Sequence, residues 1–377
     1  MRVCILFCLS LTIAWACTPK PSPSPDAPKT QNPQDNNQGD KDTERPPVDE
    51  PETPKDPPPQ QAFDESKLTD AAVVNFTSGS TTDKAVNLTA GAGGLLLMGG
   101  GLDVDAAFSN RVKAHFASSA AIDVVVLRTT GTDGYNDYLL GLLGANSVRT
   151  FVADSKDKAN NRELYQALKG AEFIWLAGGD QSEYHRFWTG TAIQFFIQDL
   201  YQRGGVVGGT SAGMATLSPI SYNPDGVAGA ITAEVIPDFC HETVKFTENF
   251  FSTTFPQYLT DTHFAERDRL GRLGNFLGHH PNVTPIGIAA DENASIFLTT
   301  DGRGVVDGAG SVYILDTKAM DASGSACGGV TSVKNIQKTK LVSGQVFNVK
   351  TGLTDGTREV FSIDGALDPS YNPENPY

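Results

Sequence analysis

Short apolar runs alternate with amphipathic stretches along the chain from about residue 63 onward. The runs at residues 94–98, 122–127 and 173–176 are rich in leucine, valine and isoleucine, and a glycine or a polar turn follows each of them. Apolar runs of this length bounded by glycine are typical of buried β-strands. We therefore predict three strands at these positions.

Amphipathic stretches follow these runs and predict helices at residues 135–143, 161–168 and 192–202. Because strands and helices alternate, we predict an α/β fold with a mostly parallel sheet flanked by helices on both faces. Ligands bind such sheets at the carboxyl ends of the strands. The glycine-rich segments after the strands, 99–101 and 178–179 among them, fall at those ends.

The last part of the chain is rich in predicted strands. Residues 284–290 and 294–298 predict two strands joined by an acidic turn, and residues 311–315 and 345–349 alternate as antiparallel strands do. We expect this β-rich part to close one edge of the sheet. The resulting division is a catalytic domain at 63–317 and a C-terminal extension at 318–377 packed on the same domain.

The N-terminal residues have the pattern of an export signal. Residues 1–17 combine an arginine, an apolar run and small residues before Cys17, as secretory signals and bacterial lipoboxes do. Residues 18–62 hold most of the 22 prolines amid polar residues, which predicts a disordered tether. We expect an exported protein of the bacterial cell envelope, either a lipoprotein anchored to the membrane through Cys17 or a secreted protein.

Charge and cysteine content exclude some classes of partner. The net charge of −15 at pH 7 argues against nucleic acid as a partner. Outside the signal only Cys240 and Cys327 remain, and whether they pair is left open, as is a homodimer. Neither cysteine lies in a CxxC motif, and His279-His280 has no further ligands at the usual spacing, so we expect no metal.

Residues 209–213 match the pattern G-x-S-x-G around Ser211. The glycines of this motif allow a strained strand-to-helix turn, called a nucleophile elbow, which exposes the serine hydroxyl. Residues 205–208 predict a short strand and residues 214–217 the start of a helix, which places the N–H of Ala212 where an oxyanion would be stabilised. On this context alone, a structural glycine turn remains the alternative.

Four segments in this order resemble the cyanophycinase and dipeptidase E family of serine peptidases, over roughly residues 90–317. They are Gly178-Gly179-Asp180-Gln181, Gly208-Gly209-Thr210-Ser211-Ala212-Gly213, Asp261-Thr262-His263-Phe264 and Asp291-Glu292-Asn293-Ala294. Three arginines, Arg267, Arg269 and Arg272, follow the third segment. The D-x-H-F sequence with these arginines resembles cyanophycinases in particular.

The resemblance implies a serine hydrolase in which Ser211 is the nucleophile, His263 the general base and Glu292 the acid that orients the imidazole. It also implies an oxyanion hole built from the backbone of Gly179 and Asp180 together with Ala212, and no metal or organic cofactor. The implied substrate-binding residues are Gln181, His185, Asp261, Thr262, Arg267, Arg269 and Arg272. Cyanophycinases typically have glutamine where this chain has Thr262 and lysine where it has His185, and both positions would face the substrate.

The three arginines are not equivalent on a helix. Arg267 and Arg269 would point about 200° apart on an ideal helix, whereas Arg269 and Arg272 would lie nearly on one face. At least one of them is therefore expected to be structural. A guanidinium in the cleft would bind a carboxylate through two parallel hydrogen bonds, which suits a substrate built on aspartate.

These observations predict an exported serine hydrolase, similar to exopeptidases, that cleaves Asp-containing peptide bonds such as the β-Asp-Arg units of cyanophycin. A dipeptidase E-like aspartyl dipeptidase is the alternative among enzymes. A catalytically idle binding lipoprotein with the same fold is the alternative from another class. For the enzyme, the expected partner is an Asp-containing peptide or polymer substrate.

Overall fold

The computed structural model describes residues 62–116, 121–283, 285–375 and 377. The predicted signal, Cys17 and nearly all of the tether lie outside the described residues. None of the helices in the described ranges has the length and the hydrophobicity needed to cross a bilayer.

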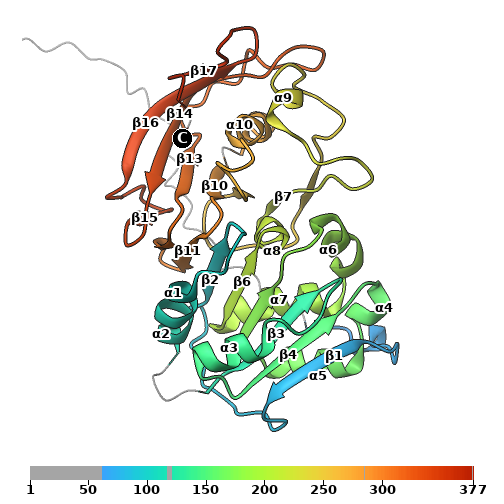
Figure 1. The fold of residues 1–377 in the computed structure, drawn as a ribbon. Helices are drawn as coiled ribbons and strands as arrows, with labels where there is room; N and C mark the ends of the chain where they lie inside the picture. Colours follow the sequence, from blue (N-terminus) through green and yellow to red (C-terminus); the bar gives the residue numbers. More distant parts are fainter. Residues whose placement is uncertain (1–61, 117–120, 284, 376) are drawn as a thin grey trace, which may run out of the picture. The chain divides into compact units, whose positions relative to one another are not determined.

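The first of two sheets has nine strands, drawn from both the N-terminal and the C-terminal parts of the described chain (Figure 1). Its strand order is β1 (Val74–Gly79), β4 (Ser147–Val152), β3 (Asp123–Arg128), β5 (Phe173–Leu176), β6 (Val206–Thr210), β2 (Gly94–Met98), β11 (Ala294–Thr299), β12 (Arg303–Gly308) and β15 (Val346–Asn348). The strands from β4 to β2 in this order are parallel, and the remaining pairs are antiparallel.

Helices cover both faces of this sheet. Leu95 and Leu97 of β2 belong to the hydrophobic core that includes α5 (Arg162–Gly170) and α7 (Ala192–Arg203). Leu96 and Met98 belong to a second core with α3 (Asn136–Leu143), η2 (Phe108–Val112) and their neighbours. Successive residues of a strand point to opposite faces, so these continuous apolar runs require a layer of helices on each side. The predicted α/β class with helices on both faces is confirmed.

The shorter helices connect these elements. They are η1 (Glu65–Lys67), α1 (Asp105–Ala107), α2 (Lys113–His115), α4 (Lys156–Ala159), α6 (Gln181–Trp188), α8 (Ala212–Thr216) and α9 (Thr232–Val235). The side chain of Asp180 accepts a hydrogen bond from Ser182 N and caps α6 directly after β5.

A second sheet of eight strands is a feature that the sequence did not predict. Its order is β17 (Tyr371–Asn372), β16 (Thr357–Asp364), β14 (Ser332–Leu341), β13 (Val312–Asp316), β10 (Ile286–Ala290), β9 (Tyr258–Asp261), β7 (Ile220–Tyr222) and β8 (Phe246–Glu248). Helix α10 (Leu270–Gly278) packs against it through Leu273, Phe276 and Leu277.

The C-terminal part therefore does more than close one edge. β15 lies at the edge of the first sheet, as expected, but β13, β14, β16 and β17 build the second sheet. The strands β10 and β11, which the acidic turn joins, belong to different sheets. Alternating apolar residues indicate a strand without indicating which strand it pairs with, so the sequence did not predict the second sheet.

Cys240 and Cys327, whose pairing the sequence left open, form a disulfide across a separation of 87 residues. The bond joins the segment that follows α9 to the segment that precedes β14.

Candidate active site

Ser211 lies on a sharp turn between the buried strand β6 and helix α8. Its φ is 53° and its ψ is −116°, a conformation that side chains rarely adopt. A Cβ on Gly209 would come within 2.5 Å of the Gly213 carbonyl carbon, and one on Gly213 within 2.2 Å of the Leu176 oxygen. Both glycines are required by close backbone approach, and the turn has the geometry of a nucleophile elbow.

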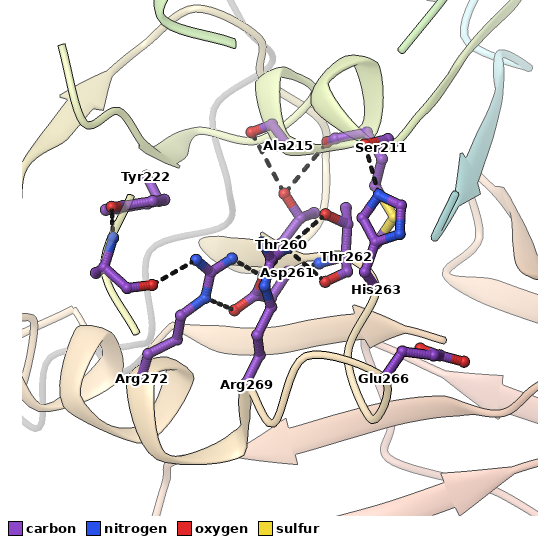
Figure 2. Close-up of polar contacts among 12 residues, drawn as sticks. Ser211, Ala215, Tyr222, Thr260, Asp261, Thr262, His263, Glu266, Arg269 and Arg272 are labelled. Carbon is purple, nitrogen blue, oxygen red and sulfur yellow. Dashed lines mark hydrogen bonds and ion pairs between the residues drawn. The ribbon is translucent and has the colours of Figure 1, made fainter. Parts of the chain in front are cut away.

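Three side chains from different parts of the fold meet at this turn. The Oγ of Ser211 lies 2.8 Å from Nε2 of His263, and Nδ1 of His263 lies 2.6 Å from Oε1 of Glu292. Figure 2 shows the serine and the histidine facing each other. Ser211 follows β6 of the first sheet, His263 follows β9 of the second, and Glu292 lies on the turn between β10 and β11, where the chain passes from one sheet to the other.

The environment of His263 favours the neutral imidazole. Burial lowers its pKa from the ordinary value of 6.5, and the positive charges of Arg267 and Arg269 lower it further, while Glu292 opposes them. A neutral imidazole can accept the proton of Ser211. Because the folded pKa of His263 lies below 6.5, the neutral base is available at neutral pH and is lost only as the pH falls through that lowered pKa.

The residues implied in oxyanion binding lie at the same edge of the sheet. Gly179 and Asp180 are exposed directly after β5, which is hydrogen-bonded to β6, and Ala212 begins α8. A Cβ on Gly178 would lie 3.6 Å from the Cβ of Ser211, so this loop passes next to the serine. Half-buried Gln181 is the first residue of α6. Backbone N–H groups at this edge could bind an oxyanion.

The loop Gly99-Gly100-Gly101 after β2 lies at the ligand-binding edge, as predicted, but its contacts with His263 and Glu292 did not follow from the sequence. A Cβ on Gly100, whose φ is 112°, would lie 2.3 Å from Cε1 of His263, and one on Gly101 would lie 2.8 Å from Cβ of Glu292. The Gly99 oxygen also accepts a hydrogen bond from His263 N at 2.9 Å. The three consecutive glycines after a predicted strand indicate a loop that allows close packing, but the sequence around them does not show which residues pack against it.

Asp261 and Arg272 do not face a substrate, contrary to the expectation for both. Both are buried, and Arg272 Nε donates to Asp261 Oδ2 at 2.9 Å while Nη2 donates to Oδ1 (Figure 2). The remaining Nη1 of Arg272 donates to the Ala230 oxygen at 2.9 Å. The second sheet and α10 remove both ions from water, so Arg272 has a structural role. Arg269 shares the same carboxylate, since its Nη1 lies 3.6 Å from Asp261 Oδ1.

His185 is also buried and does not face solvent beside Ser211 and His263. It is 4% exposed, its ring packs edge-on against Phe250 with centroids 5.1 Å apart, and neither ring nitrogen has a partner among the described residues. Burial lowers the pKa of His185 to about 4, so the ring is neutral at physiological pH. Helix α6 begins at Gln181, and one turn later His185 lies on the helix face that packs into the core.

Arg267 and Arg269 remain near the triad. Arg267 is exposed, whereas Arg269 is largely buried and its Nη1 donates to the oxygen of Thr262 at 2.7 Å and to its Oγ1 at 3.2 Å (Figure 2). Thr262 is itself buried, so it holds Arg269 and does not stand free toward solvent. Burial, with the charges of Arg272 and Arg267, lowers the pKa of Arg269 to about 10, although Asp261 opposes this.

We expect Arg272→Ala to destabilise the fold by about 3–5 kcal/mol, because it leaves the carboxylate of Asp261 buried without its bidentate partner. Urea unfolding measures this change. The matched control is Arg162→Ala, which removes an exposed arginine from a pair with exposed Asp70 and should change the unfolding free energy by less than about 1 kcal/mol. Equal effects of the two substitutions would contradict the structural role of Arg272.

Within the described ranges, no three histidine, cysteine, aspartate or glutamate side chains are grouped so that they could share a metal ion.

Comparison with known proteins gives a consistent picture. Residues 153–305 match the model of peptidase family S51. The cyanophycinase of Synechococcus elongatus is 25% identical over 213 residues, which are 55% of this chain and 62% of that protein. The cyanophycinase of Trichormus variabilis is 27% identical over 175 residues, which are 46% of this chain and 55% of that protein. The chain thus spans less than two thirds of the length of these relatives.

A solved structure shows the same fold. The crystal structure of a peptidase from an acI-B1 Actinobacterium superposes with a TM-score of 0.50 and 18% identity, covering 69% of this chain and 98% of that one. Ser211, His263 and Glu292 all lie within the segment that matches the family model. The segment that carries the three side chains is thus similar to the serine-type peptidases of family S51, and cyanophycinases are among the relatives of this chain.

Proposed function

We propose that this chain is an exported serine hydrolase, similar to exopeptidases, that cleaves Asp-containing peptide bonds, with the β-Asp-Arg units of cyanophycin as its substrate. The observation that carries the proposal is the continuous line of hydrogen bonds from Ser211 through His263 to Glu292. The cyanophycinase relatives support the choice of substrate, which is an inference for this chain.

The geometry supports an acyl-enzyme mechanism. Ser211 Oγ attacks the carbonyl carbon of the scissile bond, and His263 Nε2 takes the hydroxyl proton and then delivers it to the leaving amine. Glu292 accepts a hydrogen bond from Nδ1–H of His263 and thereby keeps Nε2 facing Ser211. A water molecule, activated by the same imidazole, then hydrolyses the ester and restores Ser211. Ala212 N–H and the Gly179 loop would hold the oxyanion.

The charge beside the triad favours a substrate with a carboxylate. Arg267 and Arg269 both act on the imidazole of His263 through their positive charge, so a ligand next to this ring also experiences it. Arg269 is largely buried, and a guanidinium shielded from water binds a carboxylate more strongly than an exposed one. An aspartyl residue at the scissile bond would supply that carboxylate.

Export is the second part of the proposal. The signal-like residues 1–17 and the proline-rich tether motivate it. The disulfide between Cys240 and Cys327 supports it, because such bonds persist mainly in oxidising compartments.

The direct test incubates the full-length chain with insoluble cyanophycin, with β-Asp-Arg and with α-Asp dipeptides, and follows released primary amines. Ser211→Ala is the matched control. Release from cyanophycin or β-Asp-Arg supports the proposal, and release from α-Asp dipeptides alone would favour the aspartyl dipeptidase. A fluorophosphonate probe that reacts with serine hydrolases adds a separate test, because failure to label Ser211 would favour the idle binding protein.

We expect Arg269→Ala to lower kcat/KM for Asp-containing substrates by roughly tenfold to a hundredfold, the effect of losing one charge-assisted hydrogen bond. Turnover of a small activated ester should change much less, because the ester has no carboxylate to bind. Both rates are measured at alkaline pH, where His263 is neutral in either protein. Arg162→Ala is the control for loss of one positive charge. An equal fall on ester and peptide would indicate damage to the triad instead of lost recognition.

A further inference from the structure

The side chain of Tyr377 binds the segment that links His263 to α10. Its Oη donates a hydrogen bond to Oδ1 of Asp268 at 3.0 Å and accepts one from Leu270 N at 3.0 Å. Its ring packs edge-on against Phe264, with centroids 5.7 Å apart, and against Tyr313, with centroids 6.1 Å apart. Tyr377 therefore contacts the residue after His263, a residue in the middle of the segment and the first residue of α10.

This segment, residues 264–270, is short, and a residue with positive φ lies both directly before it and within it. His263 has a φ of 45° and Asp268 a φ of 46°, both in the left-handed region that these residues adopt at a cost. Leu270 N is one of the first N–H groups of α10, which have no partner within the helix. The hydroxyl of Tyr377 satisfies that N–H and at the same time holds the strained Asp268. Thr232 Oγ1 also donates to the Asp268 oxygen.

The same segment carries both arginines that act on His263. Arg267 and Arg269 lie on either side of Asp268, and Figure 2 shows Arg269 and His263, which directly precedes the segment. We propose that Tyr377 is a positioning residue that holds residues 264–270 in place and thereby sets the distance of Arg267 and Arg269 from His263. The inference rests on the proposed function for its catalytic consequence, but the geometry of the segment does not depend on the substrate.

The charged groups around His263 determine how a displacement of residues 264–270 would change its pKa. Glu292 approaches from the turn between β10 and β11, and Arg267 and Arg269 approach from the segment itself. Glu266 accepts a hydrogen bond from Glu292 N, and Asp291 accepts one from Ala265 N. The loop after β2 presents only glycines to the ring. The turn that carries Glu292 is also held from outside the segment, because Asp291 N donates to the Ser311 oxygen and Asn293 N to the Gly100 oxygen, both at 2.9 Å. If the segment loosens, the two positive charges should therefore move further than Glu292, and the pKa of His263 should rise.

The test compares full-length wild-type protein with Tyr377→Phe, which keeps the ring contacts and removes both hydrogen bonds. The primary measurement is the pH titration of the His263 imidazole by NMR, which requires no activity. We expect the midpoint to move to higher pH in the variant, with the acid limb of kcat/KM moving in the same direction. KM for Asp-containing substrates should rise about threefold to tenfold, because a displaced Arg269 binds the substrate carboxylate less well, with kcat at alkaline pH unchanged.

Tyr165→Phe is the matched control. The hydroxyl of Tyr165 donates to Glu65 at 2.6 Å, a bond between a tyrosine and a carboxylate outside residues 264–270. This variant should leave the His263 titration and KM at wild-type values, whatever its effect on the melting temperature. A Tyr377→Phe titration that superimposes on that of wild type would overturn the inference. A different outcome would separate this inference from the proposed function. The His263 midpoint could shift in Tyr377→Phe as expected while the wild-type protein neither reacts with a fluorophosphonate nor cleaves any Asp-containing substrate. That result would refute the proposed function and leave Tyr377 as a positioning residue.

Discussion

Replacing Ser211 by alanine is expected to abolish hydrolysis, with a loss of kcat of about 10⁴-fold or more. The reason is that the acyl-enzyme forms on Oγ, the only hydroxyl that His263 contacts through Nε2 in the described structure. The side chains of a triad act as a unit, so His263→Ala should cause a loss of similar size. Steady-state rates on an activated ester and on an Asp-containing peptide measure both variants.

The fold should survive this substitution. Alanine has no bulk beyond the Cβ that serine already has, and serine already carries the strain of a φ of 53°. The urea midpoint of Ser211→Ala should therefore match that of the wild type. A variant that keeps activity within about tenfold of wild type would reject Ser211 as the nucleophile, since that loss is far smaller than triad removal causes.

The second large effect is expected for Gly100→Ala, which should lower kcat/KM about 10²-fold. The new Cβ would lie 2.3 Å from Cε1 of His263 and 2.6 Å from its Nε2, so the imidazole has to move. A shift of about 1 Å in a catalytic group can cost about a hundredfold in rate. Because the ring is a side chain that can turn aside, the clash should cost far more activity than stability.

Gly91→Ala is the matched control for backbone strain. Gly91 also has a positive φ, 78°, but an added Cβ would meet no atom within 4 Å. Both variants should lose a similar amount of unfolding free energy, about 1 kcal/mol for an L-residue in the left-handed region, while only Gly100→Ala should lose activity. Similar activities for the two alanine variants would mean that the loop after β2 does not hold the histidine.

Several local features of the structure followed from the sequence. The strands at residues 94–98 and 173–176 occur as predicted, because continuous apolar runs ended by glycine leave few alternatives to a buried strand. The elbow at Ser211 followed from its two glycines, whose neighbours permit no Cβ. The order of four motifs was sufficient to bring Ser211, His263 and Glu292 into one hypothesis, and the structure places them within hydrogen-bonding distance.

Other features could not follow from local patterns. The sequence pointed to three arginines after His263 without showing that Arg272 is neutralised by Asp261. It placed His185 near the substrate by analogy of position, whereas the packing of α6 turns this ring toward Phe250. In both cases the outcome depends on which side chains meet across the fold.

Sequence alone determined the types of many strands and helices and the strained turn at Ser211, because backbone sterics and apolar periodicity act over a few neighbouring residues. The roles predicted for Ser211, His263 and Glu292 came from the resemblance of four motifs to a known family. Only the tertiary structure decided that β10 and β11 enter two different sheets, with Glu292 on the turn between them, and that Gly100 packs on the imidazole of His263. Pairing, burial and charge compensation depend on contacts between residues far apart in the chain, and no local pattern specifies those contacts.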